Sequence, residues 1–362
     1  MADSPASLKA FFSATPVIRL NGQEDRQISE LLTGIKMEES EGGMSALEVN
    51  LTNWASFENA EAKIAFLPNS PKIKLGTPIE LYTREEASFR ELFRGKISAL
   101  ENEFSLSEAP KLTVLAEDAL ITGRMARRTK TYTDMSPADV ARQIASNHSL
   151  QPVIRGLSSP TDVWVQFNES DLAFLRRLVG RFDGDVQVVG NELHVSPRGE
   201  VQRGVLKLTY GNQLRWIRWT VDLAGQVTEM SVRGWDALNG SAVESKVGNG
   251  VHLGPGTGRP GASVLREAFG EHLEHLGHMA VGSTAEAQAL AEAAFDLRGR
   301  RFLKARGIAE GNAELRVGTH VTLEGMGAGL DNTFYIVSTC HVYDLQKGYR
   351  TEFSAECAYL GN

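Results

Sequence analysis

The sequence predicts a mainly β protein with α+β insertions, in which a small α+β module separates two blocks of strands. Three observations lead to this fold class. Short segments with alternating apolar residues fill residues 15–120 and return after residue 200, two amphipathic helical segments lie between residues 130 and 197, and the 362 residues include 35 glycines against 12 prolines. Frequent glycine is typical of the tight turns that join short strands.

The first block, residues 1–128, is expected to contain six or so short strands and no long helix. Apolar residues alternate through SALEVNLTN at Leu47, Val49 and Leu51, and further strands are predicted in TPIELYT, ELFRGKISALENEF and KLTVLAED. Strands without covering helices bury an apolar face by closing on themselves or stacking. We therefore expect a closed or nearly closed barrel here.

Residues 129–198 are expected to form the inserted α+β module. One helix is predicted with Ser136 as its N-cap and Asp139 in its first turn, because this spacing lets each side chain bond the other's backbone. A second helix is predicted with Asn168 as its cap. Two short strands should follow, joined by a two-residue turn at residues 190–191.

The second block is expected to be discontinuous. Residues 199–238 and 300–362 read as strands that form a second barrel, and residues 239–299 read as a loop and helical excursion between them. Within the excursion, Ser283 and Glu286 predict the start of a helix.

The last strands form a predicted hairpin in which Tyr343 faces Tyr349. One face of this hairpin should then carry Tyr335, Val337, Thr339, His341 and Tyr343 opposite Cys357, Ala355, Phe353, Thr351 and Tyr349. The other face should set Phe334, Ile336 and Val342 beside Arg350, Glu352 and Glu356. A face that is half apolar and half charged favours contact with another subunit.

The same register separates the two cysteines. Cys340 should face Glu352 and Cys357 should face Tyr335, which places the cysteines about 17 Å apart along the ladder. A disulfide needs Cα atoms within roughly 7 Å, so we expect two free thiols.

No catalytic or metal site is predicted. His272, His275 and His278 recur every third residue, and on a helix they would spread over roughly 120°, so two of them could share a metal ion. We expect solvated histidines, no metal and no cofactor. Asp183 and Asp185 flank a turn glycine, where carboxylates are common without any acid–base role.

Two basic stretches stand out in a chain whose net charge is −7. They are RMARRTK at residues 124–130 and RWIRW at residues 215–219, the second with interleaved tryptophans of the kind that stack on single-stranded nucleic acid. The acidic net charge argues against a specific nucleic-acid partner. Subunit contact or a solvated face is the preferred interpretation.

The chain shows no membrane anchor and no signal peptide. No apolar run approaches the roughly 18 to 20 residues that span a bilayer, and the first residues lack a basic segment followed by an apolar run. We expect synthesis and assembly in the cytoplasm.

Three stretches follow one another in an order that is typical of one family. The first is ELFRGKISALENEF, then KLTVLAEDAL and TYTDMSPADVARQIASNHSL. The second is NESDLAFLRRLVGRFDGDVQVVGNELHVSP, then LTYG and GQVTEMSVRGWD. The third is AEAQALAEAAF, then GIAEGNAELRVGTHVTLEG and FYIVSTCHVYDLQKGYRTEFSAE. Together they cover nearly the whole chain, which resembles the phage late control protein D family, the tail-hub relatives of VgrG.

The resemblance implies two tube-like β-barrels plus inserted modules, in a homotrimeric ring with pseudo-sixfold symmetry. It implies a structural hub, not an enzyme, in the baseplate of a contractile phage tail, a tailocin or a contractile injection system. Such a hub joins a sixfold inner tube of Hcp-like protein to a threefold spike, beside other baseplate subunits. VgrG proteins continue into an OB-fold and a β-helical needle, whereas this sequence ends at Asn362, so we expect a separate spike protein.

The resemblance also supplies candidate assembly residues. They lie in two of the matching stretches, and they are Gly234, Trp235, Asp236, Gly348, Tyr349, Arg350, Thr351, Glu352 and Phe353. Two alternatives stay open. One is a hub-associated cell-wall hydrolase with its activity in residues 130–197 or 240–282, and the other is a glycan-binding β module that uses Trp216 or Trp219.

Overall fold

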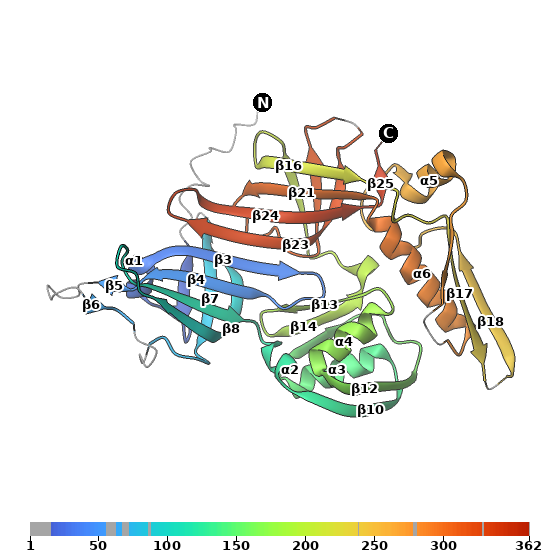
Figure 1. The fold of residues 1–362 in the computed structure, drawn as a ribbon, viewed down its shortest axis with the longest axis horizontal. Coiled ribbons are helices and arrows are strands. Elements are labelled where there is room, and N and C mark those ends of the chain that lie inside the picture. Colours follow the sequence, from blue (N-terminus) through green and yellow to red (C-terminus); the bar gives the residue numbers. More distant parts are fainter. Residues whose placement is uncertain are drawn as a thin grey trace.

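The computed structural model describes residues 16–55, 63–66, 72–85, 88–237, 239–277, 281–327 and 329–361. One large sheet runs through both β blocks, the small module lies along one side of it, and a projecting hairpin with a long helix stands at one end (Figure 1). The chain is mainly β with α+β insertions, as the sequence predicts.

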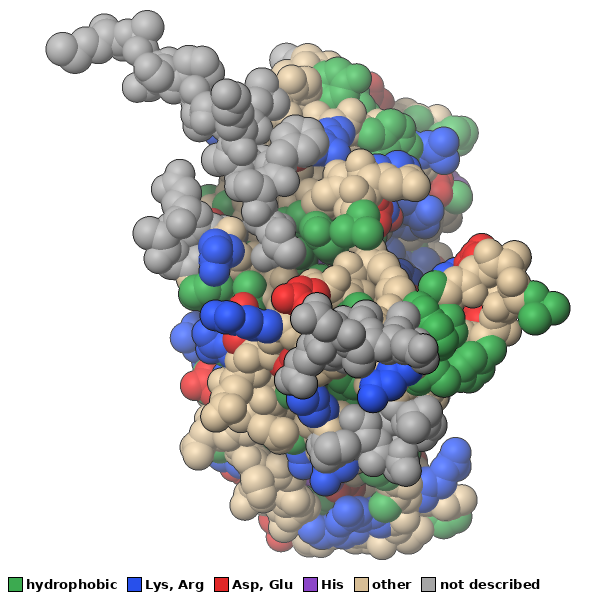
Figure 2. All heavy atoms as spheres, turned by 90° about the vertical axis from the view of Figure 1, so that its left-hand side faces the viewer, with side chains coloured by type: hydrophobic (Ala, Val, Ile, Leu, Met, Phe, Trp, Pro, Cys, Tyr) green, Lys and Arg blue, Asp and Glu red, His purple; other side chains and the backbone are tan. Residues whose placement is uncertain are grey.

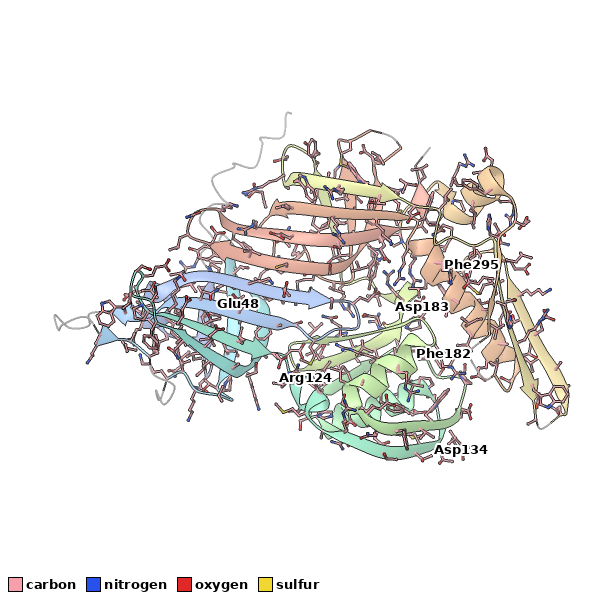
Figure 3. All side chains as sticks on the ribbon, in the orientation of Figure 1. Glu48, Arg124, Asp134, Phe182, Asp183 and Phe295 are labelled. Atoms are coloured by element: carbon pink, nitrogen blue, oxygen red, sulfur yellow. The ribbon has the colours of Figure 1, made fainter. Side chains whose placement is uncertain are left out.

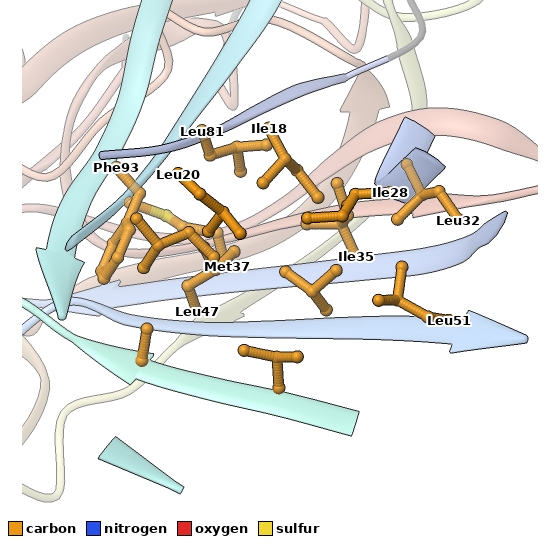
Figure 4. Close-up of a cluster of buried hydrophobic side chains, with 14 of the residues drawn as sticks. Ile18, Leu20, Ile28, Leu32, Ile35, Met37, Leu47, Leu51, Leu81 and Phe93 are labelled. Atoms are coloured by element: carbon orange, nitrogen blue, oxygen red, sulfur yellow. The ribbon is translucent and has the colours of Figure 1, made fainter. Parts of the chain in front are cut away.

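The first half of the large sheet packs around its own apolar core. Its elements are β1 (Val17–Leu20), β2 (Gln23–Glu24), α1 (Arg26–Leu31), β3 (Leu32–Ser40), β4 (Ala46–Thr52), β7 (Pro78–Glu85), β8 (Ser88–Glu103) and β9 (Lys111–Glu117). Alternate residues of these strands meet in a buried cluster that includes Ile35, Met37, Leu47 and Phe93 (Figure 4). Two short strands, β5 (Trp54–Ala55) and β6 (Lys63–Ile64), pair with each other.

The second half has a separate core. Its strands are β15 (Gly204–Thr209), β16 (Leu214–Val221), β21 (Leu303–Glu310), β22 (Thr319–Glu324), β23 (Asn332–Asp344) and β24 (Gly348–Cys357). Phe334, Ile336 and Phe353 are among its buried residues.

The two halves are joined by backbone pairing between β3 and β23, from Ser40 opposite Ser338 to Gly34 opposite Asp344. The strand order is β16-β21-β24-β23-β3-β4-β9-β8-β7-β1-β2, with β22 and β15 branching from β23. This joint was not predicted from the sequence. Within the described residues the path ends at β16 and β2, so the form of two closed barrels stays a prediction.

The two halves repeat one strand arrangement. In chain order, β3, β4, β7, β8 and β9 correspond to β16, β21, β22, β23 and β24, with equivalent antiparallel neighbours. Four register shifts fall at equivalent positions: Ile97/Ala99 in β8 and Ile336/Ser338 in β23, and Leu32/Gly34 in β3 and Leu214/Trp216 in β16. Recurrence of bulges as well as strand order marks a structural repeat, because each bulge sets a bend in its strand.

The final hairpin follows its predicted register only in part. Tyr343 faces Tyr349, and this register holds back to Ser338. A bulge at Val337 then shifts the pairing by one residue, so Tyr335 faces Glu356 and not Cys357 as predicted. The sequence pattern alone does not reveal an extra residue inside a strand.

The bulge also overturns two side-chain predictions. Phe334 and Ile336, which were expected on the outer face, are both 0% exposed. Both pack in the core of the second half, because the bulge reverses the alternation of inward and outward side chains. Cys340 and Cys357 are free thiols, as expected.

The α+β module has a third core between two helices and short strands. Its elements are α2 (Ile121–Met125), β10 (Arg127–Met135), α3 (Pro137–Asn147), β11 (Gln151–Ile154), β12 (Asp162–Ser170), α4 (Asp171–Gly180), β13 (Gly184–Val189), β14 (Glu192–Pro197) and a 3₁₀ turn at Arg198–Glu200. The predicted cap of α3 is confirmed, since Ser136 and Asp139 form a capping box. The prediction for α4 was wrong by two residues, because β12 extends through Asn168 and Ser170 is the cap.

The excursion is more ordered than predicted. It contains β18 (Ser241–Val247), β20 (Leu273–Leu276), α5 (Gly261–Phe269) and α6 (Thr284–Arg300), while β19 (Arg259–Pro260) pairs with β25 (Tyr359–Leu360). β18 and β20 pair with β17 (Glu229–Asp236), which lies just before the excursion. The three strands form their own sheet, which packs against α6 (Figure 1). The loop expected at 241–247 is therefore a strand, and the boundary predicted at residue 238 divides the β17–β18 hairpin. The side chain of Ser283 caps α6, as predicted.

An ionic junction fixes the units relative to one another. Asp183 of the module accepts hydrogen bonds from both terminal nitrogens of Arg300 at the end of α6, and Figure 3 shows it at the meeting point of the units. Arg198 pairs with Glu41 in the turn after β3. Arg198 and Arg300 are only 4% and 2% exposed, so each depends on its carboxylate partner. None of the helices in the described residues is long and apolar enough to cross a membrane.

Candidate assembly surface

The outer face of the joined sheet is hollowed into a trough of about 600 Å³. It crosses from β16 to β4, over the joint between β23 and β3. Two rows of paired residues form its floor: Trp216, Ile308, Glu352, Cys340, Glu38 and Ala46, and then Arg306, Ser354, Ser338 and Ser40. Arg218, opposite Arg306, continues the second row outside the lining. The three serines of the second row are small, and they leave the hollow.

Charge is distributed unevenly along the trough. Arg218 and Arg306 face each other at the β16–β21 end, and within the described residues neither forms an ion pair. Glu38 lies toward the other end, paired with Lys36 at 2.9 Å. One end is therefore basic and the other mixed, which favours an oriented contact with a partner.

A buried polar seam lies beneath the joint. Both oxygens of the Glu39 carboxylate accept from Arg316, at 2.6 and 2.9 Å, and Glu39 also accepts from the backbone N–H of Val317 at 2.7 Å. Burial alone would raise the pKa of Glu39, but the Arg316 charge and these hydrogen bonds outweigh it and lower the pKa. The strand β3 is thereby tied to the segment before β22.

His341 belongs to the same seam. Its Nδ1 lies 2.8 Å from the Tyr349 hydroxyl and 3.3 Å from the Thr351 hydroxyl. Burial, with the Arg316 charge as the second cause, lowers the pKa of His341 to about 3. The imidazole is therefore neutral at physiological pH.

Glu39 was missed by sequence reasoning, although a signal exists. Ile35, Met37 and Glu39 alternate on one face of β3, and the first two are core residues. A carboxylate on the apolar face of a strand indicates a buried partner. The partner, Arg316, is far away in sequence, so only the fold identifies it.

The predicted residues 348–353 divide between the two faces of β24. Tyr349, Thr351 and Phe353 are buried on the core side. Arg350 and Glu352 point outward, and Glu352 lines the trough. Gly348 has φ +69° in the turn before the strand, a conformation that glycine adopts without strain.

The predicted residues 234–236 lie in a different sheet, at the end of β17. A Cβ on Gly234 would lie 2.3 Å from the carbonyl oxygen of Val281, so this position serves close packing. Asp236 accepts from the backbone of Asn239 in the turn, and Trp235 is 59% exposed. The structure does not bring this group together with residues 348–353, and an assembly role for either stays a prediction.

The two tryptophans of RWIRW occupy opposite faces of β16. Trp216 is 43% exposed in the trough, and Trp219 packs against the core of the second half. Arg215 pairs with Glu310. Figure 2 shows the end of the molecule at the left of Figure 1, where lysine and arginine are spread among hydrophobic and acidic side chains.

The histidines do not form the helix considered above. His275 lies in β20, His272 lies just before this strand, and His278 lies outside the described residues. The described part of the chain contains no group of three or more metal-ligating side chains. Burial, with the nearby Glu38 carboxylate, raises the pKa of the Cys340 thiol to about 11, so this thiol is a poor nucleophile.

The chain shares its fold with phage tail proteins and with VgrG, as the resemblance predicts. The chain aligns with the 43 kDa tail protein of prophage MuSo2 from Shewanella oneidensis at a TM-score of 0.70 and 13% identity, over 95% of this chain and 98% of that chain. An E. coli protein, c3393, described as a component of the type VI secretion system with similarity to the T4 tail proteins gp27 and gp5, aligns at 0.61 and 10%, over 95% and 78%. In the Francisella PdpA–VgrG complex the values are 0.54 and 9%, over 95% and 58%.

A family model described as the Alg8 N-terminal domain matches residues 55–344. The match spans more than half of the chain, which therefore belongs to the Alg8 N-terminal domain family. No curated protein matches the sequence.

Proposed function

We propose that this protein is the structural hub of a contractile phage tail, tailocin or injection-system baseplate, and that three copies form a ring between a sixfold inner tube and a separate threefold spike. The tube protein is Hcp-like, and other baseplate subunits surround the ring. After assembly in the cytoplasm, the protein is part of a virion or injection particle. The fold shared with tail proteins supports this class of function.

The internal repeat carries the proposal. Each chain holds two equivalent sets of strands, joined edge to edge by β3 and β23. Three chains therefore offer six equivalent sets to a sixfold tube and three identical surfaces to a threefold spike. Closed symmetry of this kind makes many weak contacts cooperative.

The carboxylates that an enzymatic alternative would use are engaged elsewhere. Asp183 binds Arg300 and Asp185 binds Arg203, so the pair considered from the sequence does not face a shared cleft as free acid and base. This favours a mechanical role, in which the ring templates tube growth on one side and seats the spike on the other.

Mass determination in solution tests the hub. We expect a species of three chains, either for the protein alone or after addition of its tube and spike proteins, and light scattering coupled to size exclusion measures it. A single monodisperse monomer at micromolar concentration with both partners present would contradict the ring.

A further inference from the structure

Each chain contains one strand pair that joins its two halves, and among the residues described it leaves the equivalent pair of strand edges without a partner. Within the described residues, β16 pairs only with β21 apart from a single bridge between Leu214 and Tyr210, and β8 beyond Ile97 pairs only with β9. By the internal repeat, β16 is the equivalent of β3 and β8 is the equivalent of β23. These equivalents pair with each other inside the chain, whereas β8 and β16 end the run of eight strands that the repeat defines.

Unpaired strand edges of this length are uncommon on the solvent-exposed surfaces of folded proteins, because they expose rows of backbone hydrogen-bonding groups to other chains. Hydrophobic side chains accompany both edges. Trp216 and Val221 of β16 are 43% and 45% exposed, and Phe104 just after β8 is 60% exposed. These are features of a surface that another protein covers.

We propose that β8 of one copy pairs antiparallel with β16 of the next copy, in the register that β23 and β3 have within the chain. The proposal rests on the ring described above and names its contact. Repetition of one edge-to-edge step, once inside each chain and once between chains, gives a head-to-tail contact that can close into a ring.

The internal repeat predicts the register of the β8–β16 pair from that of the β23–β3 pair, residue by residue. On one side, Ala99 follows the bulge of β8 as Ser338 follows the bulge of β23, so Glu103 corresponds to Val342. On the other side, Trp216 follows the shift in β16 as Gly34 follows the shift in β3, so Arg218 corresponds to Lys36.

Within the chain, Val342 faces Lys36. Between chains, Glu103 therefore faces Arg218. By the same transfer, Glu101 faces Thr220.

Charge supports this partner. Arg218 and Glu103 are both exposed, and neither forms an ion pair within the parts of the chain that the structure describes. Both belong to the outer face of the sheet, since Arg218 faces Arg306 and Glu103 faces Lys111. The basic edge RWIRW thus contacts the acidic edge ALENE of a second copy. This contact assigns a role in subunit assembly to RWIRW.

A disulfide trap tests the register. Arg218→Cys and Glu103→Cys are combined in a Cys340→Ser background, because directly opposed antiparallel residues lie at a Cα distance that a disulfide accepts. With tube and spike proteins present, mild oxidation should give covalent dimers and trimers on a non-reducing gel. The matched control, Arg233→Cys with Glu103→Cys, should give none, because Arg233 lies on β17.

Charge reversal provides the second readout. Arg218→Glu and Glu103→Arg should each raise the concentration for half-assembly about tenfold, and the double reversal should return it to within about twofold of wild type. Arg233→Glu, which breaks an exposed ion pair with Glu244, should leave assembly unchanged. All variants should keep the thermal midpoint of the monomer, since the two edge residues are exposed.

The outcomes separate the two proposals. A wild-type chain that stays monomeric with both partners overturns the ring and the strand pair together. A ring of three that forms without the 103–218 disulfide, and that tolerates both charge reversals, overturns the strand pair alone and leaves the hub standing.

Discussion

At the scale of single residues, the polar seam between the two halves dominates. Glu39 is 3% exposed and His341 is 1% exposed, yet one is kept charged and the other neutral. The difference follows from their neighbours, because Arg316 favours the carboxylate and disfavours a second positive charge on the imidazole. Two measurable consequences follow from this arrangement.

Arg316→Met should lower the free energy of unfolding by about 3–5 kcal/mol, because it leaves the Glu39 carboxylate buried without its partner. Urea denaturation at pH 7 measures the change. Arg94→Met serves as the matched control, since Arg94 pairs with Glu80 and Glu91 at a more exposed position, and it should cost at most about 1 kcal/mol. Equal losses for the two variants would show that the seam contributes no more than a surface pair.

His341 should make stability fall as pH is lowered. Its pKa is depressed in the folded state, so between its ordinary value of 6.5 and about 3 only the unfolded chain takes up the proton. From pH 7 to pH 5, wild type should lose about 2 kcal/mol more than His341→Gln in urea denaturation.

Asp118 has the opposite effect on the pH dependence of stability, and it is present in both wild type and His341→Gln. Burial raises its pKa from 3.8 to about 6, so the folded state holds the extra proton and stability falls as pH rises through that window. The comparison of wild type with His341→Gln removes this contribution. Parallel pH profiles for the two proteins would show that His341 does not titrate differently on folding.

At the scale of elements, the sequence predicted features that depend on residues only a few positions apart. The cap of α3 was predicted because Ser136 and Asp139 satisfy each other's backbone groups at a fixed spacing. The bulge at Val337 was not predicted, because no residue pattern within β23 reveals it. It lies where the partner on one side of β23 changes from β22 to β3. The strand at 241–247 was missed because its polar outer side chains and neighbouring glycines read as a loop.

The capping box predicts a modest, local effect. Ser136→Ala should destabilise the chain by about 1 kcal/mol, because the Asp139 backbone N–H loses its acceptor, the Ser136 hydroxyl oxygen. Thermal and urea denaturation measure it. Ser146→Ala, an exposed serine in the last turn of the same helix, should stay within about 0.5 kcal/mol of wild type. A larger loss at Ser146 than at Ser136 would contradict the capping argument.

At the scale of the whole molecule, the sequence predicted two β blocks and an inserted module but not how the blocks meet. The pairing of β3 with β23 connects residues some 300 positions apart, such as Glu39 opposite Thr339, and no local pattern specifies such a contact. The sequence pointed to only a few residues of the candidate surface, such as Glu352 and Trp216, since the trough and its seam arise from this joint. The mass of the assembled species and the strand pair between β8 and β16 are the predictions that belong to this scale.

The insertion between β16 and β21 breaks the equivalence of the two halves. In the first half, β3 passes to β4 through the short turn at residues 41–45, whereas the equivalent connection in the second half holds the β17–β18 hairpin, α5 and α6. A ring of three chains contains six similar halves. It would therefore carry this insertion at only three of them, and these would alternate with halves that have only the short turn. A binding partner that contacts this insertion would therefore bind at alternate halves of the ring and would detect threefold symmetry in place of sixfold.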